Sequence, residues 1–159
     1  METINPEAVC CPPFDSTHWD DVQISWDNKL FIKEKVATFF YIPLGFGKAM
    51  TKLNNLVEKA DAKMPDGLCL SQHTSKWNMD LLLAIDREIV GVENLKLTGN
   101  FYSKVYEGNY NDTGKWTADF EQLCSKKGYS IEKLFMWYTT CPKCAKKYGK
   151  NFTVLIAKI

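Results

Sequence analysis

Six cysteines are the residues of this 159-residue chain whose spacing most directly suggests chemistry. Cys141 and Cys144 form a Cys-x-x-Cys turn, in which both sulfur atoms can face one point, as zinc coordination and disulfide redox chemistry both require. A second cluster, Cys10 and Cys11, lies side by side in a segment rich in proline. Four thiolates would suffice to bind a structural zinc that ties this segment to the domain: Cys10, Cys11, Cys141 and Cys144.

Other assignments of these cysteines stay open. Adjacent cysteines are an unusual pair for one tetrahedral metal, so Asp15 and His18 are reserve ligands and unliganded thiols are the alternative. A redox-active pair is less favoured, because nothing around it has the strand–helix–strand pattern of a thioredoxin-like protein. Cys69 and Cys124 fall on a strand and on the apolar face of a helix, where packed thiols are expected. No cofactor is required, and zinc is the one metal that the sequence suggests.

Aromatic residues make up 13% of the chain, more than a core of this size needs. Trp and Tyr favour surfaces that are partly apolar and partly polar, so their excess predicts an aromatic-lined pocket. The sequence contains no Gly-x-Ser-x-Gly, no His-Glu-x-x-His and no glycine-rich phosphate loop. Of its two histidines, His18 and His73, only His73 lies near a segment that could border a pocket. The residues therefore indicate a binding site more clearly than a catalytic motif.

Composition excludes several classes of protein. Hydrophobic residues at 45% and charged residues at 25% are typical of a folded domain. A formal net charge of +1 provides no general attraction to nucleic acid or to an acidic membrane surface. The first residues lack the cationic start and apolar stretch of a secretory signal, and no apolar run approaches the ~20 residues of a membrane span. We therefore expect a cytoplasmic domain that binds neither nucleic acid nor membranes and that could still report to a protein partner.

The elements that must position these residues form two similar series. Residues 29–40 read as a strand, 48–60 as an amphipathic helix, and 68–72 and 79–85 as two further strands. A strand at 95–107, a helix at 114–127 and strands at 134–140 and 152–159 repeat that order. This pattern predicts an α+β domain of duplicated βαββ units with pseudo-twofold symmetry. Its antiparallel sheet would carry both helices on one face and a ligand cleft on the other.

The domain organisation follows from this repeat. Residues 1–28 match neither unit and are expected to form an irregular N-terminal arm, since they include three prolines. The single folded domain then spans 29–159, with the first repeat at about 29–90 and the second at about 91–159.

Three motifs of the second half resemble those of GyrI-like effector-binding domains. The family pattern is a strand carrying Val-x-x-Gly-x-Tyr, a Trp-bearing helix and a late strand bearing Phe-Glu-x-Tyr. The chain resembles it in the run from Gly99 to Tyr110, in the helix beginning near Gly114-Lys-Trp and in the late strand Phe135-Met-Trp-Tyr. The resemblance extends over roughly residues 30–159. It implies a duplicated βαββ module, found in multidrug regulators, in free-standing binding proteins and in some hydrolases. Its cleft would hold a flat, hydrophobic molecule between aromatic rings.

The chain departs from this pattern at Met136, where the family usually has a buried glutamate. An apolar residue there would suit a neutral ligand, because a buried carboxylate without a partner is costly. Asp80 or Glu107 could supply a carboxylate from another direction, and the resemblance favours Tyr138 as a stacking and hydrogen-bonding residue. Trp137 and Tyr138 are adjacent on one strand, so at most one of them can enter the cleft. The candidate catalytic residues are Asp80, Glu107 and Tyr138, and the candidate ligand contacts are Tyr41, Trp77, Phe101, Tyr106, Met136, Trp137 and Tyr138.

Two functions follow as expectations. The first is a free-standing effector- or drug-binding module that holds a flat hydrophobic molecule in an aromatic-lined cleft. The alternative is a GyrI-like hydrolase that uses a cleft carboxylate on a strained or activated small molecule. A DNA-reading regulator is disfavoured, because no helix-turn-helix is appended and the net charge is near zero.

Overall fold

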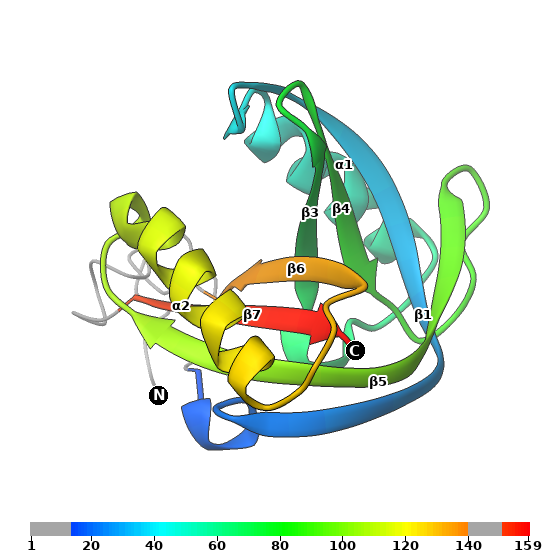
Figure 1. The fold of residues 1–159 in the computed structure, drawn as a ribbon. Helices are drawn as coiled ribbons and strands as arrows, with labels where there is room; N and C mark the ends of the chain where they lie inside the picture. The colour runs from blue at the N-terminus through cyan, green and yellow to red at the C-terminus, as the bar shows by residue number, and fades with distance from the viewer. Residues whose placement is uncertain (1–13, 140–150) are drawn as a thin grey trace, which may run out of the picture.

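The computed structural model describes residues 14–139 and 151–159, which form one antiparallel sheet and two α-helices (Figure 1). Three short 3-10 helices, at Ser16–His18, Pro65–Gly67 and Tyr110–Asp112, connect these elements. In chain order the main elements are β1 (Val22–Phe39), β2 (Ile42–Pro43), α1 (Phe46–Lys59), β3 (Cys69–Ser75), β4 (Asn78–Ala84), β5 (Glu93–Glu107), α2 (Thr113–Lys126), β6 (Lys133–Tyr138) and β7 (Phe152–Lys158).

The sheet closes into a barrel because two long strands each pair on both sides. The order is β2-β1-β4-β3-β6-β7-β5, and β5 pairs back onto β1. Leaving out β2, which extends only the end of β1, six of the seven strands make up the wall. Among the strand pairings of the barrel wall, that of β3 with β6 is the shortest, because only Ser71 and Met136 are in register. Closure of this kind leaves no long unpaired edge.

Alternating side chains fill the inside of this barrel. Phe31 and Phe101 are fully buried there, and Trp26 packs against both, with ring centroids 5.9 Å and 4.4 Å away. Leu82 from β4 and Ile156 from β7 belong to the same cluster. Because inward residues occur at every second position, their neighbours on each strand point outward.

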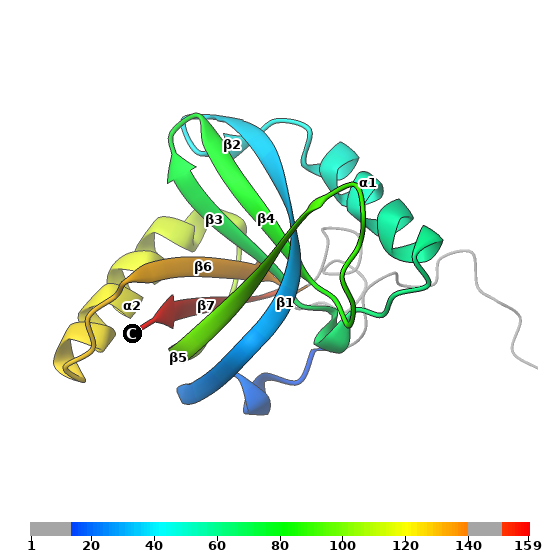
Figure 2. The same ribbon diagram turned by 90° about the vertical axis from the view of Figure 1, so that its right-hand side faces the viewer.

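Both helices lie on the outside of the barrel wall (Figures 1 and 2), where they cover outward-facing residues. Leu53 and Val57, one turn apart on α1, are buried with Ile32, Leu81 and Leu83. The corresponding face of α2 is Trp116, Phe120 and Cys124, which pack on Tyr102 and Leu155. Fully burying a side chain such as Leu53 is worth about 1.5–3 kcal/mol. Packing of these apolar stripes therefore fixes each helix on the outside of the wall.

The predicted elements agree closely with the observed ones, and, apart from the short β2, each half of the chain runs strand, helix, strand, strand. The pairings also correspond: β1–β4 and β3–β4 in the first half match β5–β7 and β6–β7 in the second. This correspondence supports the duplication, although equivalence of the two units in three dimensions stays a prediction.

Two expectations about the sheet are wrong. The face opposite the helices is not an open concave surface, because the sheet closes into a barrel and an apolar cluster fills most of its inside. The irregular arm does not extend to residue 28, because β1 already begins at Val22. Asn28 adopts φ 53° inside an irregularity between Trp26 and Lys29, and the strand continues past it.

Within residues 14–139 and 151–159, no helix combines the length and the hydropathy needed to cross a membrane.

Candidate active site on the outer face of the barrel

The outer face of the wall between the two helices gathers the polar and aromatic residues best placed for a site. Cys69 on β3 packs with the cluster under α1, whereas Met136 on β6 packs with the cluster under α2. Ser71, which is buried, pairs with Met136 between these two clusters. We call this region the interhelix strip and define it by Ser71, His73, Met136, Tyr138 and Thr153, which share the outward side of their strands.

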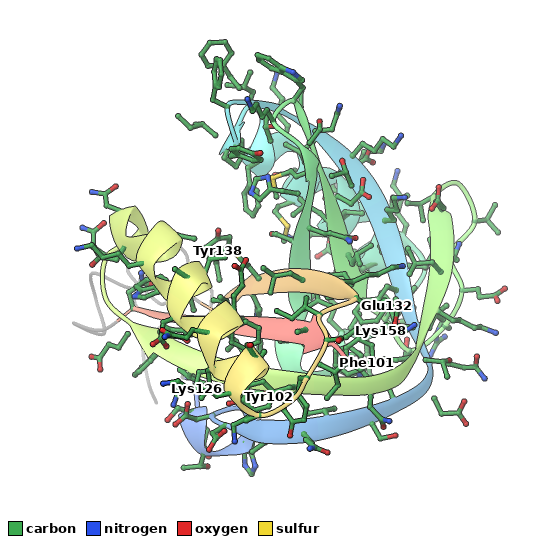
Figure 3. The ribbon with its side chains drawn as sticks, in the orientation of Figure 1. Phe101, Tyr102, Lys126, Glu132, Tyr138 and Lys158 are labelled. Atoms are coloured by element: carbon green, nitrogen blue, oxygen red, sulfur yellow. The ribbon has the colours of Figure 1, made fainter. Side chains whose placement is uncertain are left out.

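Tyr138 lies at the end of β6, beside α2 and away from Phe101 on β5 (Figure 3). Its side chain is half-buried, and its hydroxyl donates to the sulfur of Met136 at 3.4 Å. Residues i and i+2 of a strand share a face, so Met136 and Tyr138 present a thioether and a phenol side by side. This pair can stack on an apolar ligand and offer it one hydroxyl group.

A polar row continues from Tyr138 across β7 and β5. Thr153 pairs with Tyr138 on one side and with Tyr106 on the other. Tyr106 donates its hydroxyl to a carboxylate oxygen of Asp119 at 2.6 Å and stacks on Trp116. Burial, and then the hydrogen bond to Asp119, raise the pKa of the Tyr106 phenol well above its usual range. Tyr106 therefore remains protonated at physiological pH.

Thr153 leaves an unsatisfied polar atom in this row. Its side chain is 0% exposed, and its hydroxyl has no hydrogen-bond partner among the described residues. A buried hydroxyl of this kind costs free energy unless another molecule supplies the partner.

His73 is the titratable residue of the interhelix strip. Its Nδ1 atom is buried and, within the part of the chain that the structure describes, has no hydrogen-bond partner. Burial lowers the pKa of the imidazole below its ordinary value of 6.5, so the ring is neutral at pH 7. The ring of Tyr41 packs edge-on against it, with centroids 5.5 Å apart. A neutral imidazole with an unpartnered nitrogen can accept a proton.

The predicted ligand contacts divide between this face and the barrel interior. Tyr106, Met136 and Tyr138 lie on the outer face, and Tyr41 reaches it through His73. Phe101 and Trp137 instead point into the barrel, where they belong to the apolar cluster. Period-two alternation places these two residues on the side opposite Tyr102 and Tyr138, so they are core residues and not part of the outer face. Trp77 is half-exposed in the turn between β3 and β4.

Asp80 also faces inward rather than toward Tyr138. It is 6% exposed and lies 3.5 Å from the ammonium group of Lys33, which in turn lies 3.3 Å from Glu93. Burial alone would lower the pKa of Lys33, but the charges of Asp80 and Glu93 hold it above its ordinary value. Asp80 thus balances a lysine charge on the inward side of the sheet and is absent from the interhelix strip.

Glu107, the other predicted carboxylate, is exposed at the last position of β5. Alternation places it on the side opposite Tyr106, so the structure does not bring it to Tyr138. The four cysteines predicted to bind zinc, Cys10, Cys11, Cys141 and Cys144, lie outside the described residues. Cys69 and Cys124 are packed thiols as expected, and burial raises the pKa of Cys69 to about 12.

Sequence reasoning missed Ser71, Thr153 and Asp119 and gave His73 little weight. Alternation along β3 could have linked His73 with Ser71, since the two are two residues apart. Thr153 joins the strip only through the pairing of β6 with β7, and Asp119 only through the position of α2. No local sequence pattern predicts these contacts, because they join segments that are far apart in the chain.

Comparison with known proteins gives one family and several similar structures. The chain matches the family described as bacterial hydrolase over residues 1–159. A crystal structure of a hydrolase from Listeria innocua is 14% identical, with a TM-score of 0.61 and coverage of 87% of this chain and 91% of that one. An uncharacterized conserved protein from Listeria innocua is 13% identical over the same shares of both chains, with a TM-score of 0.64. No curated protein matches. At such identities the similar structures show the fold alone.

Proposed function

We propose that this chain, which belongs to the bacterial hydrolase family, hydrolyses an activated small molecule that binds at the interhelix strip. The observation that carries the proposal is the buried Nδ1 atom of His73, which has no hydrogen-bond partner among the described residues and lies on the same face of the sheet as Tyr138. The hydrolase names of the family and of similar Listeria innocua structures support this function over binding alone.

His73 fits the part of general base better than either predicted carboxylate. Its burial keeps the imidazole neutral at pH 7, as the acceptor of a proton must be. Asp80 is held by Lys33 on the other side of the sheet, and Glu107 is exposed at a strand end. A water molecule placed against Nδ1 would also satisfy a buried atom for which residues 14–139 and 151–159 supply no partner.

The reaction is hydrolysis of an activated ester or a comparable electrophile. The water oxygen forms a bond to the electrophilic carbon while His73 takes one proton from that water. The bond from this carbon to the leaving group then breaks with its electron pair, and the proton passes from His73 to the leaving group. The products are an acid and an alcohol or phenol, and the imidazole returns to its neutral form.

Binding at the same face would use the apolar and aromatic residues around His73. Tyr41 already packs against the imidazole, and Tyr138 and Met136 offer a ring and an adaptable thioether. Met136 contributes no charge, which favours a neutral, flat substrate over a cation. The resemblance to GyrI-like domains supports an aromatic cleft of this type, with Tyr138 as a substrate contact.

The pH dependence of hydrolysis tests the proposal. With p-nitrophenyl acetate as probe, we expect kcat/KM to be constant near pH 7 and to fall as the pH drops through a pKa below 6.5. The value of kcat/KM falls at low pH because only the unprotonated imidazole is active, and the fall begins below the ordinary histidine pKa because burial has lowered the pKa of His73. The p-nitrophenol released is measured in quenched samples from pH ~4.5 to ~8, and the rate of spontaneous hydrolysis is subtracted at each pH. This pH range covers the usual range of histidine pKa values. A profile without this acidic limb, or no rate above the spontaneous one, contradicts the proposal.

A further inference from the structure

One end of the molecule exposes a group of large apolar side chains. Phe39, Phe40, Ile42, Leu44 and Trp77, here called the tip patch, are 50–63% exposed. Phe39, Phe40 and Trp77 pack on one another with ring centroids 4.9–5.8 Å apart. Backbone hydrogen bonds from Thr38 to Trp77 and from Tyr41 to Lys76 join the β1–β2 hairpin to the β3–β4 turn. The patch is therefore a shared, ordered surface rather than scattered side chains.

The backbone holds this patch outward in an unfavourable conformation. Phe39 pairs with Ile42, which leaves Phe40 and Tyr41 as a two-residue hairpin loop. Their φ angles are 45° and 69°, in the left-handed region that Asn and Gly normally occupy in such loops. For a bulky residue this conformation costs about 1–2 kcal/mol. Strain of this kind is typical of functional surfaces, where a side chain is kept for what it contacts.

The chain segments that carry the tip patch contain basic but no acidic residues. Residues 35–57 contain Lys35, Lys48 and Lys52 but no acidic residue, and residues 67–79 contain Lys76 and likewise none. The ammonium group of Lys76 lies 5.8 Å from the ring centre of Phe40. Of these lysines, Lys52 is paired with Glu34. The whole chain has a net charge of only +1, so this local excess of lysines is not a general property of the molecule.

We propose that the tip patch docks this protein on an anionic lipid surface. Aromatic side chains prefer the boundary between water and lipid, and lysines beside them are attracted to acidic headgroups. A lipid surface accommodates Phe, Trp and Ile side chains side by side without requiring a complementary shape. The inference is independent of the hydrolase proposal, since the tip patch shares no residue with the interhelix strip.

Sedimentation with vesicles tests the proposal. We expect the protein to bind vesicles containing phosphatidylglycerol and phosphatidylcholine, and to bind pure phosphatidylcholine or vesicles in high salt more weakly. Phe40→Asn should lower the partition coefficient about tenfold, because it removes a half-exposed aromatic side chain from the contact. Since Asn tolerates the left-handed conformation, the variant should melt at the same temperature or higher.

Val90 provides the matched control, because it is an apolar residue that is 97% exposed outside the tip patch. Val90→Ser should leave vesicle binding unchanged. Absence of binding by the natural protein, or equal binding by Phe40→Asn, overturns the proposal. A concentration-dependent dimer that is lost in Phe40→Asn, without vesicle binding, would assign the patch to a second copy of the chain instead.

Discussion

Replacing His73 by Gln is expected to lower kcat/KM for p-nitrophenyl acetate by about 100-fold or more, the usual contribution of a general base. Glutamine keeps hydrogen-bonding capacity at this position but cannot take a proton from water near neutral pH. KM should change little, because the substrate contacts of Tyr41 and Tyr138 remain. The acidic limb of the pH profile should disappear together with the rate.

The chain offers its own control for this variant. His18 is the other histidine, and it is well exposed beside Asp15. His18→Gln should keep the natural rate and pH profile. If His73→Gln retains full activity while its melting temperature is unchanged, His73 is not the base.

Replacing Phe101 by Ala is expected to lower the free energy of unfolding by about 3–5 kcal/mol, the usual cost of truncating a buried aromatic residue. Phe101 is 0% exposed and packs against Trp26 inside the barrel. The loss should be visible in urea denaturation, while KM of the folded protein stays near its natural value. Phe101 was predicted from the sequence as a ligand contact, so this variant distinguishes a core residue from a binding residue.

Tyr41→Ala is the matched comparison, because Tyr41 is half-exposed and packs against His73. We expect it to change stability by no more than about 0.5 kcal/mol and to raise KM. Raised KM in Phe101→Ala, with stability retained, would place the ligand inside the barrel and contradict the site described above.

The elements of the fold were largely predictable, whereas the closure of the barrel was not. Leu53 and Val57 on α1, and Trp116 and Phe120 on α2, recur at helical spacing, which reveals each helix from the sequence alone. Closure depends on β1 pairing with β4 and β5 at once and on the contact of Ser71 with Met136. These pairings join residues far apart in the chain, and no local pattern specifies them. An open sheet was therefore expected where the strands in fact curl around a filled core.

The sequence predicted several of the residues gathered in the candidate site but not the face of the sheet on which they lie. The family resemblance favoured Tyr138 over Trp137 for a cleft opposite the helices, but Trp137 is the residue that faces that side, in the core, and Tyr138 lies on the outer face with the helices. On β5, Phe101 was predicted to line a cleft opposite the helices, and it does face that side, where it belongs to the packed core, whereas Tyr102 faces α2. Asp80 was expected at the cleft because it begins a strand, and it does face the side opposite the helices. What the sequence did not predict is its ion pair with Lys33, which follows from the register of β4 with β1.

The most direct test of the central claim is whether a substrate analogue binds beside His73 on the outer face. With only two histidines in the chain, the imidazole signals of His73 and His18 can be followed separately by NMR. Titration with acetanilide, an amide that resists hydrolysis and resembles an aryl ester, should shift the His73 signals and leave those of His18 unchanged. Shifts confined to the indole signals of Trp26 and Trp137, with His73 unaffected, would place the ligand in the barrel interior and contradict the account.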